Sequence, residues 1–335
     1  MRKIFVLSLF LIILTGIVKG QQDVVKPGEI WKDVDGNLIN SHGAGIMEYK
    51  GTYYLYGEIK NGNTWLVPNL GWECYRVPAG GISCYSSKDL LNWKNEGFAL
   101  ATTTNDPTSD IDTGKVIERP KVVYNKSTGK FVMWMHIDSK DYSYARSGVA
   151  VSDSPNGPFV YINSVRPNGN MARDMTLFQD DDGKVYHFYS SEENSTMHIS
   201  LLSDDYLSHT KTEKRILINQ SRESPAVFKY NKKYYVITSG TTGWSPNPAA
   251  YAVANSVLGE WTNLGNPCIG SDADKTFYSQ STYVLPLKKN SFIYLGDRWN
   301  KLDLKDSRMV WLPIEMKDGK PEITWKSSWK VQTKK

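Results

Sequence analysis

Three carboxylates and one carboxamide recur at the same place in a repeated sequence pattern. When the repeats are aligned on the apolar residues before each turn, one column holds Gly43, Glu118, Asp174, Glu223 and Gln280. Each of these positions precedes a run of apolar residues, where a charge has no packing role. A simpler interpretation is that the carboxylates are strand-end charges, neutralised by the adjacent Arg119, Arg173 and Arg222. Because three carboxylates fall in register, we favour a common functional site.

Crowded carboxylates with few cations suit the hydrolysis of a glycosidic bond. One carboxyl group must hold a proton near neutral pH and deliver it to the leaving oxygen, which requires a pKa raised by burial or by like charges. A second group must orient or deprotonate a water molecule on the opposite face of the sugar. The 11 Trp and 20 Tyr residues agree with this chemistry, because sugar rings offer apolar C–H faces to aromatic rings, although most of these aromatics are expected in the core.

The elements that must position these residues are five copies of a hairpin pattern. The copies span residues 42–58, 118–136, 173–191, 222–239 and 279–297. Each has the pattern of two short strands around a tight turn, of which Asp182-Gly183 is the clearest. A further alternating pattern follows each copy, so a repeat holds about four strands and no helix of period 3.6. We predict an all-β chain folded as a five-bladed β-propeller, with a two-sheet sandwich as the alternative.

Composition and motifs argue against several classes of function. A formal charge of +5 on 335 residues, with both signs interspersed, does not indicate a nucleic-acid partner or an anionic membrane. A Gly-rich phosphate loop is absent from the sequence, which argues against a nucleotide enzyme. No linker divides the chain, so we expect one domain over residues 21–335. The longest departure from the repeat is 60–80, which contains Trp65, Trp72 and Tyr75 and is expected to form a surface loop beside a cleft.

Residues 1–20 have the pattern of a secretory signal peptide. A basic start is followed by an apolar stretch over 4–18, and cleavage is expected near Gly20. The apolar stretch has about 15 residues and a bilayer requires about 20, so we expect no membrane span. We therefore expect a secreted or periplasmic protein. In such a compartment Cys74 and Cys84 could form a disulfide and leave Cys268 over, or all three thiols could stay free.

Eight sequence stretches, spread over four successive repeats, are jointly specific. They are INSHGAGIMEYKGTYYLYGE, SSKDLLNW, ERPKVVYN, MWMHID, SGVAVSDSPNGPF, RDMTLFQDDDG, RESPAVFKY and TTGWSPN. On these stretches the mature chain resembles glycoside hydrolase family 43 throughout its length, and it looks closest to the branch of exo-β-1,3-galactanases (galactan 1,3-β-galactosidases). The resemblance implies a five-bladed propeller that hydrolyses glycosidic bonds with inversion and without a cofactor.

The resemblance also implies roles for the aligned residues. Glu223 in RESPA matches the general acid, and Asp174 in RDMT matches the carboxylate that keeps that acid protonated and holds the sugar. Gly43 stands where the family in general has its base Asp, as in the galactanase branch. We favour Gln280 as the group that orients the water, with Glu118 as a sugar ligand or partner of Gln280; Glu118 as the base is the alternative. Inversion predicts about 6.5–9.5 Å between Glu223 and the group that holds the water.

Seven further residues lie just after the inner strands and are expected to bind the sugar. They are Glu58, Tyr142, Glu193, Asn194, Thr242, Trp244 and Trp299. Trp244 either stacks on a galactose face or packs in the core, and Glu58 either binds sugar hydroxyls or is a surface charge. We expect no metal site, because no His/Cys/Asp spacing supports one, and His42 and His136 are expected to be structural.

Together with the aligned carboxylates, the resemblance implies an exo-acting inverting glycoside hydrolase that releases galactose from β-1,3-galactan, the backbone of arabinogalactan. We expect a monomer whose partner is the polysaccharide or its oligosaccharides. The alternative within the same fold is an α-L-arabinofuranosidase or a β-xylosidase, which needs a base carboxylate that reaches the site from a loop, for instance Glu58. The alternative from another class is a non-catalytic carbohydrate-binding propeller.

Overall fold

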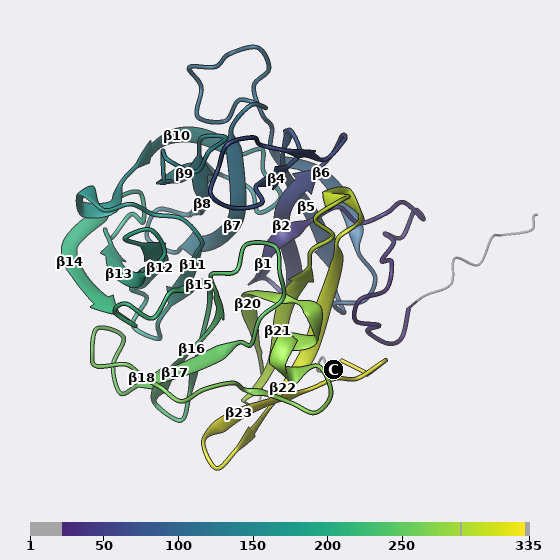
Figure 1. Ribbon diagram of the computed structural model, residues 1–335, viewed down its shortest axis with the longest axis vertical. Coiled ribbons are helices and arrows are strands. Elements are labelled where there is room, and N and C mark those ends of the chain that lie inside the picture. Colours follow the sequence, from purple (N-terminus) through teal and green to yellow (C-terminus); the bar gives the residue numbers. More distant parts are fainter. Residues whose placement is uncertain (1–21, 289, 332–335) are drawn as a thin grey trace, which may run out of the picture.

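Five sheets surround a common axis in the computed structural model, which describes residues 22–288 and 290–331 (Figure 1). The first blade contains β1 (His42–Tyr49), β2 (Thr52–Lys60), β5 (Ala79–Ser87) and β6 (Lys94–Leu100). The second contains β7 (Val116–Asn125), β8 (Lys130–Asp138), β9 (Arg146–Ser152) and β10 (Val160–Val165). The third contains β11 (Met175–Gln179), β12 (Val185–Ser191), β13 (Thr196–Leu202) and β14 (His209–Ile216).

The last two blades complete the ring and confirm the predicted five-bladed propeller. The fourth contains β15 (Arg222–Tyr230), β16 (Lys233–Gly240), β17 (Ala250–Ala254) and β18 (Thr262–Asn263). The fifth contains β20 (Gln280–Leu287), β21 (Ser291–Arg298), β22 (Arg308–Lys317) and β23 (Lys320–Thr324), with β19 (Cys268–Ile269) added in parallel to β23. A separate ribbon joins β3 (Trp65–Leu66) and β4 (Tyr75–Arg76). Helical structure in the described residues is confined to the 3₁₀ turns η1 (Pro167–Gly169), η2 (Ala273–Tyr278) and η3 (Leu304–Asp306).

Irregular pairing near the start of the innermost strands places polar side chains at the axis. The register between the first two strands of a blade shifts after His42, after Glu118 and after Glu223. In each case a residue next to the shift has a positive φ, namely 57° at Gly43, 54° at Arg119 and 57° at Ser224. A β-bulge turns the neighbouring side chain out of the regular alternation. The strands can therefore keep apolar residues between the blades and still present a carboxylate at their ends.

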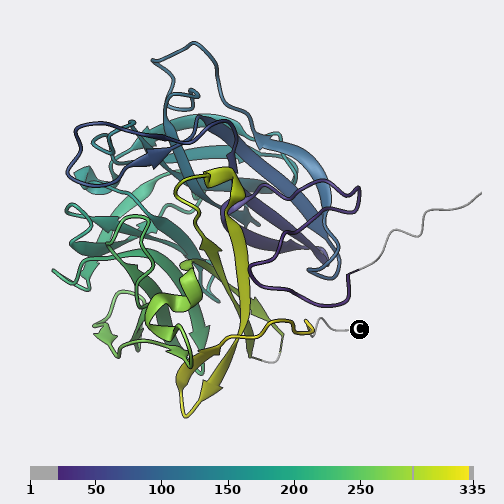
Figure 2. The same cartoon turned by 45° about the vertical axis from the view of Figure 1, so that its right-hand side comes forward.

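Apolar clusters between neighbouring blades hold the ring together. The cluster between the first and fifth blades contains Trp311, which is 1% exposed and whose ring lies 4.8 Å from that of Trp31 and 5.9 Å from that of Trp93. A bridge between Val25 and Trp329 joins the two ends of the described chain at the same place. Figure 2 shows the yellow C-terminal strands beside the purple N-terminal segment. Ring closure in the described residues thus depends on side-chain packing, this bridge and single hydrogen bonds such as Gly28 N to Met309 O at 2.8 Å, rather than on exchange of a strand between the two blades.

The structure also bears on the cysteines and on membrane insertion. Cys74, Cys84 and Cys268 are all buried free thiols, so the disulfide considered between Cys74 and Cys84 is not formed. Among residues 22–288 and 290–331, no helix has the length and hydropathy needed to cross a bilayer. The predicted signal peptide, residues 1–20, lies outside the described residues.

The substitution Trp311→Ala is expected to weaken the closure between the first and fifth blades. Removal of this fully buried indole leaves a cavity against Trp31 and Trp93 and should lower the free energy of unfolding by about 3–5 kcal/mol. Denaturant or thermal unfolding measures the loss. Phe98→Ala, on an edge strand with 58% of the residue exposed, is the control and should change stability by about 0.5 kcal/mol or less. Equal losses in the two variants would contradict this account of closure.

Candidate active site

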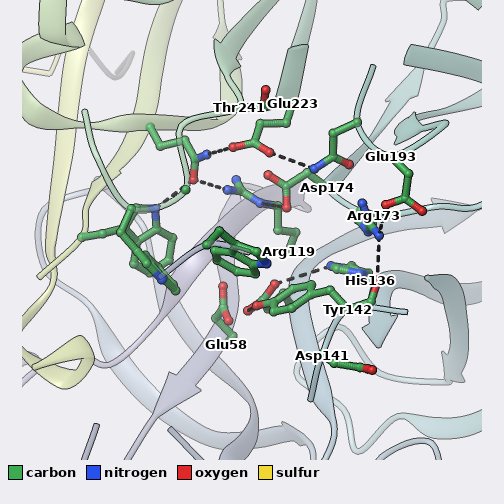
Figure 3. Close-up of a pocket in the computed structure, with 17 residues that line it drawn as sticks. Glu58, Arg119, His136, Asp141, Tyr142, Arg173, Asp174, Glu193, Glu223 and Thr241 are labelled. Carbon is green, nitrogen blue, oxygen red and sulfur yellow. Dashed lines mark hydrogen bonds and ion pairs between the residues drawn. The ribbon is translucent and has the colours of Figure 1, made fainter. Parts of the chain in front are cut away.

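One cavity of about 390 Å³ lies at the end of the axis where the inner strands begin, and each blade contributes a polar side chain to it. These side chains are Glu58, Glu118, Asp174, Glu223 and Gln280. The predicted convergence of Glu118, Asp174, Glu223 and Gln280 is therefore found in the structure. The first blade contributes Glu58 from β2, because Gly43 on β1 has no side chain to offer. Figure 3 shows Glu223, Asp174 and Arg119 together on one side of this cavity, and Glu58, Tyr142 and His136 on the other.

Gln280 uses all four hydrogen-bonding positions of its amide. Its Nε2 donates to Glu223 Oε1 at 2.9 Å and to Ser239 Oγ at 3.1 Å. Its Oε1 accepts from Arg119 Nη2 at 2.5 Å and from Trp299 Nε1 at 2.9 Å. The partners of Oε1 are donors in every protonation state, so a flipped amide would set donors against donors. The network therefore fixes the orientation of the amide and stabilises the ordinary amide form over the imidic tautomer, whose O–H would face these two donors.

The contact between Gln280 and Glu223 contradicts one expectation from the sequence. An inverting pair was expected about 6.5–9.5 Å apart, with a sugar and a water between the two groups. Here the two side chains are in direct contact at 2.9 Å. In this arrangement Gln280 cannot hold a water on the far side of a sugar from Glu223. Binding of substrate has to separate the two side chains before Gln280 can serve in that role.

Arg119 connects the groups at the base of the cavity, a role that the sequence did not reveal. Its Nε contacts Asp174 Oδ1 at 2.8 Å, and its Nη1 donates to the backbone oxygen of Ser281 at 2.9 Å. Together with the bond to Gln280, the guanidinium links the second, third and fifth blades. Arg119 is only 4% exposed; burial lowers its pKa, but the surrounding carboxylates outweigh burial and raise it. In the sequence, only its position beside Glu118 singled it out, as a cation that could neutralise a carboxylate at the end of a strand.

Glu223 has the environment of a carboxylic acid that keeps its proton at neutral pH. Burial, followed by the negative charge of Asp174, raises its pKa to about 8. Asn194 Nδ2 donates to Glu223 Oε2 at 3.1 Å, so both carboxyl oxygens accept from amides. Asp174 is itself held by Arg119 and by the hydroxyl of Ser224 at 2.5 Å. The arrangement separates the two carboxylates into a proton donor and a charged neighbour.

Glu118 has the opposite environment. Burial acts to raise its pKa, but Lys60, with Nζ 3.4 Å from Oε1, and His136 outweigh burial and hold the pKa well below its ordinary value. The hydroxyl of Tyr142 also donates to Oε1 at 2.9 Å. A carboxylate stabilised by this many donors is a weak base. The structure thus favours Glu118 as a hydrogen-bond acceptor for substrate hydroxyls over Glu118 as the base.

One group of side chains in the cavity has the spacing of a metal site, namely Glu118, His136 and Asp174, whose ligand atoms lie within 4.8 Å of one another. Metal ligation requires a neutral imidazole. Burial lowers the pKa of His136, but contacts to Asp138 and Glu118 outweigh burial and raise it to about 9. Asp174 is already paired with the Arg119 guanidinium. These residues fit a network of opposite charges better than a metal ion.

The remaining predicted residues lie at different depths. Glu58 is 3% exposed, with its Oε2 2.7 Å from Lys60 Nζ, and burial raises its pKa. Trp244 and Trp299 form one wall, with ring centroids 5.5 Å apart in an edge-to-face arrangement. Glu193 is at the rim, paired with Arg173 at 2.7 Å. Thr242 does not line the cavity: its hydroxyl donates to Ser245 O at 2.6 Å, and Thr241 and Gly243 line the cavity instead.

Trp72 is a lining residue that the sequence placed only in a loop. It projects from the segment between β3 and β4, is 41% exposed, and packs edge-to-face on Tyr142 at 5.5 Å. The predicted loop beside a cleft over residues 60–80 therefore does form part of the wall. The aromatic content of that segment indicated a wall beside the cleft, but it did not show which residue faces the cavity.

Comparison with known proteins gives a consistent result. Residues 41–320 match the family described as Glycosyl hydrolases, family 43. A β-1,3-galactosidase of this family, solved with galactodeoxynojirimycin, is 44% identical over 92% of this chain and 100% of its own, with a TM-score of 0.85. An exo-β-1,3-galactanase from Phanerochaete chrysosporium, solved with β-1,3-galactotriose, is 35% identical over 93% of this chain and 69% of its own, with a TM-score of 0.85.

A shorter match points to another sugar. A xylan 1,3-β-xylosidase from a Vibrio species is 30% identical over 112 residues, which are 32% of this chain and 20% of the Vibrio protein. The match thus covers about a fifth of the length of that curated relative.

The pKa of Glu223 is expected to lie near 8 and to depend on Asp174. Replacement of Asp174 by Asn removes a negative charge that raises this pKa, so the pKa should fall toward 4.5, by about one unit or more. Carbon-13 NMR of the glutamate carboxyl groups measures it, with Glu223→Gln to assign the signal. Asp181→Asn, in an exposed turn, should leave the titration unchanged. A Glu223 signal that titrates near 4.5 in the wild type would refute this account.

Proposed function

The chain belongs to family 43 of the glycosyl hydrolases, and we propose that it is an exo-acting, inverting enzyme that releases galactose from β-1,3-galactan, the backbone of arabinogalactan. The observation that carries the proposal is Glu223, a half-buried residue whose carboxyl group has a pKa of about 8 in a cavity lined by all five blades. The likeness to a β-1,3-galactosidase and an exo-β-1,3-galactanase supports galactose as the sugar and the 1,3 linkage.

The form of the cavity supports attack on a chain end. Beneath Arg119, the buried Lys121 donates from Nζ to the backbone oxygens of Gly43 at 2.9 Å and Arg119 at 3.3 Å. These contacts occupy the axis below the cavity. A sugar chain that enters the cavity therefore cannot continue along the axis through the propeller, which suits a terminal sugar.

In this mechanism Glu223 donates its proton to the leaving oxygen as the glycosidic bond breaks. The negative charge of Asp174, which Arg119 and Ser224 hold in place, helps to keep Glu223 protonated. As pH rises through about 8 the acid form of Glu223 is lost, and activity is expected to fall. Glu58, Glu118 and Tyr142 are assigned to hydroxyl binding, and Trp244 with Trp299 to the apolar face of the sugar.

We assign Gln280 the role of orienting the attacking water. This role requires that the substrate first separates Gln280 from Glu223. The amide oxygen is turned toward Arg119 and Trp299 and becomes available to a water only if one of these donors is displaced. Glu118 is the alternative, and its low pKa argues against it.

Glu58 favours a second candidate within the family. A carboxylate in the first blade that reaches the cavity was the feature required for a β-xylosidase or an α-L-arabinofuranosidase, and Glu58 does reach it. The partial match to a xylan 1,3-β-xylosidase points the same way. Against this candidate, Glu58 is paired with Lys60 at 2.7 Å, which suits a fixed sugar ligand rather than a base.

The proposal includes export of the protein from the cytoplasm. The basic and apolar pattern of residues 1–20 supports a signal peptide that is cleaved near Gly20, and hence a secreted or periplasmic enzyme. A polysaccharide substrate too large to cross a membrane agrees with this location.

The mature protein is expected to release galactose from linear β-1,3-galactan and nothing from arabinan or xylan. The first anomer observed by proton NMR should be α-galactose, because inversion converts a β linkage. Chromatography of the products gives the sugar and shows whether monomers or oligomers appear first. Xylose or arabinose as the product would favour the second candidate. A folded protein that binds galactan and cleaves none of the three polymers would indicate a binding propeller.

Turnover of two different substrates distinguishes the general acid from the group that holds the water. Glu223→Gln should lower turnover of galactan by about 10²–10⁴-fold, yet retain turnover of an aryl β-galactoside whose leaving group needs no proton. Gln280→Ala should lose turnover on both substrates, because the water is still required. Glu118→Gln should raise KM more than it lowers kcat. If Glu118→Gln is inactive on both substrates while Gln280→Ala keeps turnover, Glu118 is the base and our assignment is wrong.

A further inference from the structure

A second cavity, of about 560 Å³, adjoins the active-site cavity, and its lining differs in charge. It shares Trp244 and Trp299 with the active site, so the two indoles form a common wall. Beyond this wall the lining includes Arg298, Lys301 and Arg308, with Asp306 as the carboxylate. The active site has crowded carboxylates, whereas this cavity has an excess of cations. We call it the cationic cavity.

Two of these cations face each other across the sheet. Arg298 on β21 and Arg308 on β22 are direct cross-strand partners. Like charges in this position are destabilising unless an anion lies between them. Arg308 is paired with Asp306. In the described residues, no carboxylate lies within ion-pair distance of Arg298; its Nη2 donates to the backbone oxygen of Phe277 at 2.8 Å.

Two side chains that line the cationic cavity each carry a buried donor without a partner. The donors are Arg298 Nε and Trp244 Nε1, both lacking a hydrogen-bond acceptor among residues 22–288 and 290–331. A buried donor without an acceptor is costly, and in native proteins it often marks the place of a ligand. Burial lowers the pKa of Arg298 against the opposing effect of Tyr278 and Asp272, and its guanidinium lies over the rings of Tyr278 and Trp325 at 5.8 and 5.2 Å.

We propose that the cationic cavity binds an anionic substituent on a side branch of the polysaccharide, namely a uronic-acid carboxylate or a sulfate ester. The terminal sugar of the same polysaccharide lies in the active site. This inference rests on the proposed function, because the shared wall of Trp244 and Trp299 places the branch beside the sugar being cleaved. The acceptor oxygens of the substituent would pair with Arg298 and Arg308. Lys301 is held by Glu73 from the segment between β3 and β4, an exposed pair that is weak enough for a ligand to replace.

The test compares substrates that differ only in charge. The β-1,3-galacto-oligosaccharide carries a branch that ends in a uronic acid or in the corresponding carboxyl-reduced sugar, and a second pair carries a sulfated or unsulfated branch. The wild type should show about a tenfold higher kcat/KM for at least one charged member, as expected for a charge-assisted hydrogen bond. High salt should reduce this preference.

Variants locate the effect in the cationic cavity. Arg308→Gln combined with Lys301→Gln should reduce the preference to about twofold and leave kcat/KM for linear neutral galactan unchanged. Both side chains are partly exposed, which limits the effect on folding. Lys211→Gln and Lys317→Gln, which remove the same charge from exposed sites outside the cavity, form the matched control and should keep the full preference.

Calorimetry with the Glu223→Gln variant provides a readout that does not depend on turnover. The charged oligosaccharide should bind about tenfold more tightly than its neutral counterpart. Equal kcat/KM and equal affinity for both members of both pairs would overturn the inference. Failure of the wild type to release galactose from the linear neutral substrate is a different result, because it rejects the proposed function.

Discussion

The Arg119 guanidinium is the interaction on which the rest of the site depends. It is buried at the axis and joins Asp174, the amide of Gln280 and the backbone of Ser281, which belong to two other blades. Its positive charge lowers the pKa of Glu223, but burial and the negative charge of Asp174 outweigh this effect and raise that pKa to about 8. Because the guanidinium pairs with Asp174 through its Nε and not with Glu223, Glu223 can keep the proton. The general acid is therefore a consequence of how three blades meet around one side chain.

The inner strands reconcile two conflicting requirements. Their apolar residues must alternate between the faces of a blade to fill the space between neighbours, and a polar side chain at the same strand would be buried in that space. The bulges at Gly43, Arg119 and Ser224 interrupt the regular pairing next to the polar residues, which pair again beyond the shift. The positive φ at Arg119 and Ser224 costs conformational energy, and such strain is found where a site requires it.

Most of the fold and part of the site could be predicted from the sequence. Five hairpin repeats with an outer pair of strands predict five blades, and the register of the repeats predicts that Glu118, Asp174, Glu223 and Gln280 converge. The sequence could not show that Gln280 contacts Glu223 directly, because the contact depends on side-chain conformations at the axis. It also did not separate Thr241 from Thr242 at the rim, since loops follow no periodicity. Arg119 and Lys60 were missed because an alternating strand pattern gives no signal for a buried cation.

The absence of a carboxylate at Gly43 has a steric cause that the alignment of the five repeats does not suggest. A Cβ at this position would lie 2.5 Å from Glu58 Oε1 and 3.2 Å from the backbone nitrogen of Arg119. The backbone N–H of Gly43 donates to Asp297 Oδ2 at 3.0 Å, which fixes the strand close to the fifth blade. The missing side chain thus makes room for the carboxylate of Glu58, which comes from β2. The first blade supplies its acidic group from the neighbouring strand, and this displacement leaves the water-holding role to a residue outside that blade.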